Sequence, residues 1–282
     1  MKIKIFLLSL ALVVVSCGNR NTTDNTKSVV EVNFGDTSTN NNDNKIYTRY
    51  QIPLPVDLFE VLSEKGEFNK NILLPVSYGN NYESEVQKAI ALGLYNADLA
   101  YCSVFGQGQA SIDYFNVSKN IAQELNIEKG YSDELFEKMN KYMDNVDSLV
   151  DYVNTVYRNT CNYMEERQMK NVLPFVVASG WYESLYIILK SKSPNLNERE
   201  IRKIVLEQEK GFKHVKKFLY DEQIESSAFY YHKYLKQIIA GIDSILRLYK
   251  KYEISPADRD AVYRQLVKEI IRQRERFVRG EI

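Results

Sequence analysis

Two carboxylates stand in otherwise apolar stretches of the sequence and are its best candidates for chemistry. Asp98 lies inside the apolar run 82–105, and Glu183 is the only charged residue between positions 172 and 189. Burying a charge is costly unless the charge is paired or hydrogen-bonded. We therefore expect each carboxylate to have a partner, such as Arg158 or one of the tyrosine hydroxyls.

Two roles are open to these carboxylates. As a polar clasp they would join one helix to another without a ligand. As a ligand-binding site they would form a polar spot in a cleft beside aromatic residues of the same two stretches. That site would comprise Asp98, Tyr101, Trp181, Tyr182 and Glu183. The same carboxylates also leave open an envelope hydrolase, which would need them around a concave pocket and not in a filled core.

The elements that must hold these residues are helices. Apolar residues recur at helical spacing along most of the chain, and no run of alternating strand residues interrupts them. We expect helices over 56–65, 82–105, 107–126, 132–169, 172–189, 197–220, 224–252 and 256–279, with an irregular segment over 67–81. The stretch 132–169 forms either one long helix or two that meet near Asn145. The sequence thus predicts one all-α domain of about seven or eight helices over residues 47–282.

Other motifs give no sign of a metal or a cofactor, and we expect neither. A catalytic zinc site takes three protein ligands, whereas the chain has only two histidines, His214 and His232, each followed by lysine within three residues. Surface positions suit both histidines. The Gly106-Gln107-Gly108 motif follows a helical stretch, whereas a phosphate-binding loop follows a strand, so we interpret it as a turn.

The charge balance argues against nucleic acid as a partner. Lys and Arg number 37, as do Asp and Glu, and the hydrophobic share of 44% is that of an ordinary globular protein. Two cysteines, Cys102 and Cys161, lie in apolar helical positions. They form either a disulfide, which an exported protein permits, or two buried thiols that pack as small apolar side chains.

The first residues of the chain predict export. Lys2 and Lys4 precede an apolar run over 5–15, which ends in small and branched residues before Cys17. This run is too short to span a bilayer and has the parts of a secretory signal peptide over residues 1–16. Residues 17–46, rich in Asn and Thr, carry too little apolar surface to order themselves, so we expect a disordered tether.

With Cys17 in place, the leader resembles that of a bacterial lipoprotein, although Val14 stands where leucine is usual. The resemblance implies that Cys17 is acylated and becomes the mature N-terminus. Stable anchoring needs more than one acyl chain, and the lipoprotein pathway supplies them. The alternative is an ordinary cleaved leader with an incidental cysteine.

The stretches 93–101 and 105–125 resemble a segment of uncharacterised all-helical lipoproteins of Bacteroidetes. This resemblance implies a location and a fold but no activity. Lipoproteins of this kind are often kept at the inner membrane by an aspartate after the cysteine, where this chain has Gly18. No acidic run follows to mark surface export, which favours an outer-membrane anchor facing the periplasm. We expect a non-enzymatic binding or scaffold domain in the cell envelope, with an envelope protein or a small molecule as its partner.

Overall fold

The computed structural model describes residues 52, 54–131, 133–225 and 229–282. The predicted signal peptide over 1–16, Cys17 and the predicted tether over 17–46 lie outside these residues. Within them the chain forms ten α-helices, and no β-strand is present, so the all-α prediction is confirmed. The α-helices are α2 (Pro55–Ser63), α3 (Glu85–Val104), α4 (Gly108–Glu124), α5 (Asp133–Tyr142), α6 (Val146–Glu166), α7 (Leu173–Lys190), α8 (Glu198–Glu207), α9 (Glu209–Glu225), α10 (Phe229–Ile254) and α11 (Arg259–Arg279). Short 3₁₀ helices are η1 (Lys70–Ile72), η2 (Val76–Asn81), η3 (Glu128–Tyr131) and η4 (Pro256–Asp258).

The described helices outnumber the prediction because two expected helices are each divided. The stretch 132–169 forms α5 and α6, which is the second of the two alternatives that the sequence left open. Asn145 starts α6, since its side-chain oxygen accepts a hydrogen bond from the Ser148 backbone N–H at 2.9 Å. The stretch 197–220 is divided at Gln208 into α8 and α9. The helical spacing of apolar residues therefore continues across both breaks between helices.

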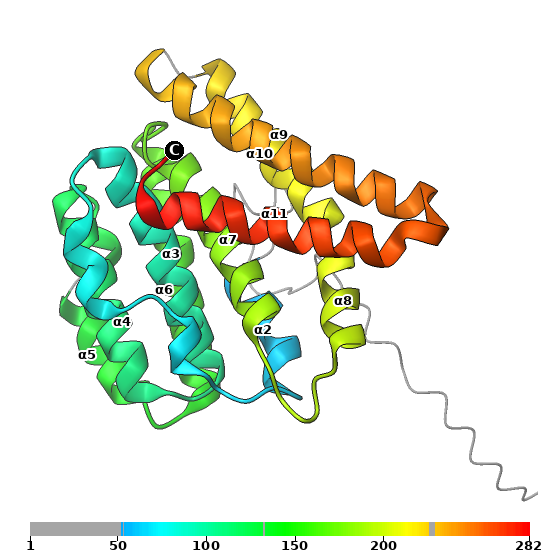
Figure 1. Cartoon of the computed structure of the whole chain (residues 1–282). Coiled ribbons are helices and arrows are strands. Elements are labelled where there is room, and N and C mark those ends of the chain that lie inside the picture. Colours follow the sequence, from blue (N-terminus) through cyan, green and yellow to red (C-terminus); the bar gives the residue numbers. More distant parts are fainter. Residues whose placement is uncertain (1–51, 53, 132, 226–228) are drawn as a thin grey trace, which may run out of the picture. The chain divides into compact units, whose positions relative to one another are not determined.

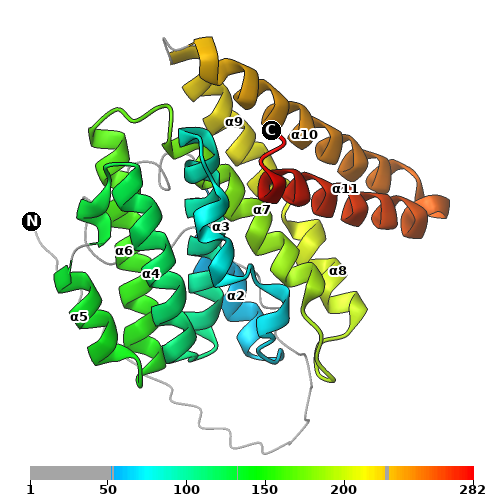
Figure 2. The same ribbon diagram turned by 60° about the vertical axis from the view of Figure 1, so that its left-hand side comes forward.

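The domain is organised around the pair α3 and α7, which pack more extensively against each other than any other two elements of the described chain (Figures 1 and 2). A glycine makes this close approach possible, because a Cβ added at Gly93 would lie 2.1 Å from Ser179 Oγ and 2.2 Å from the Val176 carbonyl oxygen. The Ser179 hydroxyl then donates a hydrogen bond to the Ile90 carbonyl oxygen at 2.8 Å, which joins the two helices.

The other helices surround this pair in two groups. Helices α2, α4 and α6 pack against α3, and η2 packs onto α4. On the other side, α11 lies against α7, and α10 packs against both α9 and α11 (Figure 1). None of the described helices is long and apolar enough to cross a bilayer. The apolar side chains of α3 and α7 instead form the middle of the core.

The two cysteines of the helical domain are not joined by a disulfide. Cys102 on α3 and Cys161 on α6 are both fully buried. Burial raises the pKa of the Cys102 thiol well above its ordinary value, so the thiol stays neutral. Of the two alternatives, the structure contains the buried thiols.

Candidate functional site

The two carboxylates predicted to break apolar helices are both fully buried, Asp98 on α3 and Glu183 on α7. Glu183 is held by Arg274 of α11 in a two-point ion pair. Arg274 Nε donates to Glu183 Oε2, and Nη2 donates to Oε1, each at 2.7 Å. The guanidinium carbon of Arg274 also lies 3.9 Å from the ring centroid of Tyr186. The carboxylate therefore joins α7 to α11 as a polar clasp.

The partner of Glu183 differs from the one expected. The expected partner of each carboxylate is present for Glu183, but of the examples given, Arg158 and the tyrosine hydroxyls, Arg158 lies on α6, where its charge acts on Asp57. Burial raises the pKa of Asp57, and the charge of Arg158 opposes that rise. The choice of Arg158 was wrong because helix contacts distant in sequence decide the pairing, and Glu183 and Arg274 are 91 residues apart.

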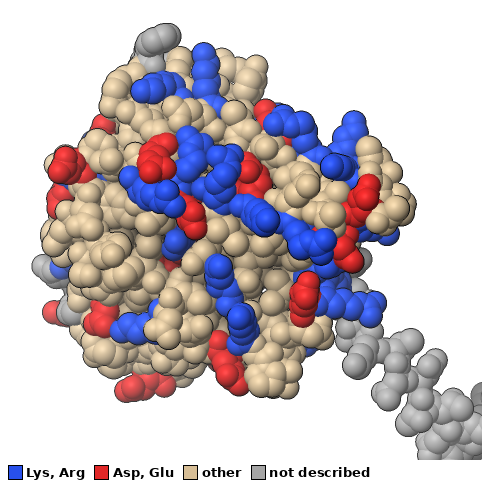
Figure 3. All heavy atoms as spheres, viewed as in Figure 1, with Lys and Arg blue, Asp and Glu red and all other residues tan. Residues whose placement is uncertain are grey.

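Arg274 also departs from its neighbours on α11. The sequence suggests a solvated face for Arg272, Arg274, Arg276 and Arg279 with glutamates interspersed. Arg272 and Arg279 fit this description, with ion pairs to Glu269 and Glu275. Basic and acidic side chains are mixed on the face that carries α11 (Figure 3). Arg274 is instead buried, because the helical period places it on the same side as Ile270 and Phe277.

Asp98 shares this buried region without a cation of its own. One of its oxygens, Oδ2, accepts a hydrogen bond from the Leu74 backbone N–H at 3.1 Å, and Oδ1 has no hydrogen-bond partner. Burial and the negative charge of Glu183 raise the pKa of Asp98 well above its ordinary value, and Arg274 only partly opposes them. With one cation for two carboxylates, Asp98 is held in its neutral form, which makes an unpartnered oxygen less costly.

The three aromatic residues predicted beside the carboxylates do not meet in one cleft. The Tyr101 ring packs on the Phe68 ring with centroids 5.4 Å apart, and its hydroxyl accepts a hydrogen bond from the Asn69 backbone N–H at 3.1 Å. Trp181 and Tyr182 both pack against Phe212, with centroids 6.0 and 5.7 Å from it. Of the five predicted ligand-binding residues, Trp181 lines a narrow hollow, and none of the five lines the wider hollow described next. The structure therefore encloses these residues in the core.

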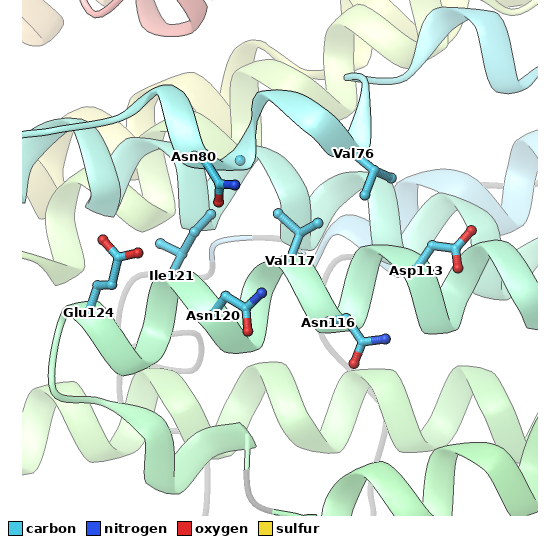
Figure 4. A pocket seen from close by; sticks show the side chains of 9 residues that line it. Val76, Asn80, Asp113, Asn116, Val117, Asn120, Ile121 and Glu124 are labelled. Carbon is cyan, nitrogen blue, oxygen red and sulfur yellow. The ribbon is translucent and has the colours of Figure 1, made fainter.

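A larger hollow than the one beside Trp181 lies between η2 and α4. It has a volume of about 300 Å³. Its lining consists of Val76, Gly79, Asn80, Asp113, Asn116, Val117, Asn120, Ile121 and Glu124. We call this the η2–α4 groove. Asn80 points from η2 toward α4, Asn116 and Asn120 project from α4, and the two carboxylates stand at opposite ends (Figure 4).

The local sequence explains how the groove forms. Its α4 residues recur every three or four positions, which places them on one face of that helix. Val117 and Ile121 are buried and form the apolar floor, whereas Asn116 and Asn120 are exposed. Gly79 lets η2 come close, since a Cβ there would lie 2.6 Å from Val117 Cγ1. A short helix with one glycine therefore forms the second wall.

The groove is equipped for recognition by hydrogen bonds. A carboxamide offers two donors and one acceptor oxygen, so three asparagines can meet donors and acceptors alike. Asp113 accepts a hydrogen bond from Gln109 Nε2 at 3.0 Å, and Glu124 forms an ion pair with Lys88 at 2.6 Å. Eleven residues of helix separate the two carboxylates, or about 16 Å. Paired carboxylates of a glycosidase stand about 5 to 9.5 Å apart, so this pair does not suit that reaction.

Sequence reasoning missed the groove residues. The sequence does place four polar residues on one face of an amphipathic helix, namely Asp113, Asn116, Asn120 and Glu124. Exposed polar residues are normal on such a face. Nothing in the sequence shows that η2 packs against the edge of this face. The site depends on a contact between two elements.

The described residues contain no cluster of side chains suited to hold a metal ion. His214 on α9 and His232 on α10 are both partly buried, so neither is as exposed as the surface interpretation supposed.

No family model, no curated protein and no solved structure matches this chain.

Proposed function

We propose that the chain is a membrane-anchored cell-envelope lipoprotein whose helical domain binds a partner or a small ligand, without catalysis, in the η2–α4 groove. The observation that carries the binding role is the groove itself, a hollow of about 300 Å³ that combines an apolar floor with three carboxamides. Ligand sites combine these features, a concave apolar surface and a few polar groups that fix orientation.

The placement of the two core carboxylates supports a role without catalysis. A hydrolase that used Asp98 and Glu183 would need a substrate to reach them. Both are fully buried, and Glu183 is engaged by Arg274 at two points. Their role is to join helices, which leaves recognition to the groove.

The anchor is supported by the sequence of the leader. Cys17 follows an apolar run of signal-peptide length, and lipid attached there would hold the domain through residues 17–46. A flexible chain of that length has a typical end-to-end distance of about 30 Å. We place the anchor in the outer membrane with the domain facing the periplasm, close enough to the membrane to meet envelope components.

Photo-crosslinking in cells that make the natural chain tests the binding role. A photoreactive amino acid at position 120 lies in the groove, and one at position 265 lies on the exposed surface of α11. Intact mass spectrometry records adducts of macromolecules and of small molecules. We expect a discrete adduct at position 120 that is absent at position 265. Equal adducts at both positions, or none at position 120, would refute a binding groove.

A further inference from the structure

We propose that the ligand of the η2–α4 groove is an extended peptide segment that carries basic side chains. This inference rests on the proposed function, because it names the class of ligand for the same groove. It follows from the spacing of the asparagines, the charge of the groove and the nature of its floor.

The spacing of the asparagines on α4 matches the repeat of an extended peptide. Asn116 and Asn120 are four residues apart on the helix, a rise of about 6 Å. An extended chain advances about 6.6 to 6.8 Å over two residues, the interval after which its side chains return to the same face. A carboxamide can donate to a peptide carbonyl and accept from a peptide N–H at the same time. The two asparagines can thus pair with alternate residues of one peptide.

The third asparagine lies on the opposite wall. Asn80 belongs to η2 and points toward α4 across the apolar floor (Figure 4). A peptide lying along α4 would therefore meet carboxamides on both sides, while its alternate side chains would rest on Val76, which is 37% exposed, and on the uncovered edges of Val117 and Ile121. Such a peptide would leave few of its main-chain groups without a partner.

The charge of the groove selects basic side chains. Among the residues that the structure describes, Asp113 and Glu124 are the only charged ones that line the groove, and no Lys or Arg does. Lys88 occupies one side of Glu124, but the Glu124 side chain remains 53% exposed and can accept a second cation. Lysines at the first and fifth positions of an extended peptide point to the same side about 13 Å apart. Their long side chains cover the remaining distance to carboxylates about 16 Å apart.

The lining also argues against a sugar as the ligand. None of the nine lining residues is aromatic, so no ring is available to stack on a sugar ring. A peptide needs no such ring, since aliphatic side chains pack well on a floor of Val117 and Ile121.

Fluorescence anisotropy with the full chain, extracted in detergent, tests this inference. The main probe is a capped peptide with lysines at its first and fifth positions and alternating valine and threonine between them. A second peptide carries glutamates in place of the lysines, and a third carries N-methyl groups on its central amides. We expect saturable binding of the lysine peptide, weakened by salt. We expect the other two peptides to bind about tenfold more weakly or worse.

Matched variants assign the binding to the groove. Asn116→Ala combined with Asn120→Ala should weaken binding of the lysine peptide about tenfold, as should Asp113→Asn combined with Glu124→Gln. The controls Gln265→Ala on α11 and Glu253→Gln on α10 replace exposed residues and should leave binding unchanged. All these positions are on the surface, and unchanged circular dichroism confirms that the variants fold.

Three results would overturn the inference. The lysine peptide could fail to bind, it could bind equally to the groove variants, or the glutamate peptide could bind as well as the lysine peptide. If a neutral disaccharide binds and the peptides do not, and if the double asparagine variant no longer binds the disaccharide, the peptide ligand is refuted. The groove would then still be a binding site. If no adduct forms at position 120 in cells, both the peptide ligand and the binding groove are refuted.

Discussion

At the scale of single residues, the Glu183–Arg274 pair is the contact whose loss should cost most. Removing one partner of a buried ion pair leaves the other charge without compensation. We expect Glu183→Gln to lower the free energy of unfolding by about 3 to 5 kcal/mol, measured by urea denaturation followed by circular dichroism. Glu275→Gln is the matched control, because Glu275 pairs with Arg279 on the surface, and it should cost less than about 1 kcal/mol. Equal losses in the two variants would show that the clasp contributes little.

Asp98 should make the folded protein less stable as the pH rises. An unfolded aspartate loses its proton near pH 4, about its ordinary pKa, whereas folded Asp98 keeps its proton to a higher pH. Above about pH 4 the unfolded state therefore binds fewer protons than the folded state, and the free energy of unfolding falls with rising pH until the folded pKa is passed. Asp98→Asn removes this contribution and keeps an acceptor for the Leu74 N–H. We expect the variant to gain stability relative to the natural chain as the pH rises from about pH 4 toward the folded pKa of Asp98. Melting temperatures across this range measure the difference, and parallel curves for the two proteins would contradict it.

Some of these residue properties could be predicted from the sequence and others could not. A carboxylate in an apolar helix is visible as a break in pattern, so the burial of Asp98 and Glu183 was predictable, and the structure confirms it. The identity of the partner was not, because Arg274 looks like its charged neighbours until α11 packs against α7. The groove residues were hidden for the same reason, since they become a site only where η2 meets α4.

At the scale of elements, the close contact of α3 with α7 depends on Gly93. A methyl group there would meet Ser179 Oγ and the Val176 carbonyl oxygen, and the backbone carbonyl has little freedom to yield. We expect Gly93→Ala to destabilise the domain by about 1 to 3 kcal/mol or more, as overpacking of a filled core does. The same denaturation measurement decides it.

The neighbouring glycine of α7 provides the control for this prediction. A Cβ at Gly180 would lie 3.2 Å from the Gly93 carbonyl oxygen, a much milder contact than those at Gly93. Gly180→Ala should therefore cost less than Gly93→Ala. If the two variants are equally stable, the helix pair is held by other contacts.

Helix content was predictable at this scale, and so was a break near Asn145 as one of two alternatives, whereas the break at Gln208 was not. Periodic apolar residues mark the helices over 82–105 and 172–189, which the structure contains as α3 and α7. The same periodicity continues across Asn145 and Gln208, where the chain changes direction. Both sides of a break can present apolar faces to one core, so the spacing alone did not reveal the break at Gln208.

At the scale of the whole molecule, the proposal combines the leader sequence with the structure of the helical domain. The leader sequence predicts export and a lipid anchor, and the helical domain supplies a groove with donors, acceptors and two carboxylates. Within the described residues, the core is built from the helical domain. A tethered binding domain is the simplest arrangement that uses both.

The central claim is that this domain works while lipid at Cys17 holds it to the membrane, and fatty-acid labelling tests that claim most directly. Cells that make the natural chain are fed an alkynyl fatty acid, and the label on the purified protein is measured beside that on Cys17→Ala. Ser16→Ala, which keeps a small residue before the cysteine, serves as the control. We predict label on the natural chain and on Ser16→Ala, and none on Cys17→Ala. Label retained by Cys17→Ala, or absent from the natural chain, would contradict the account.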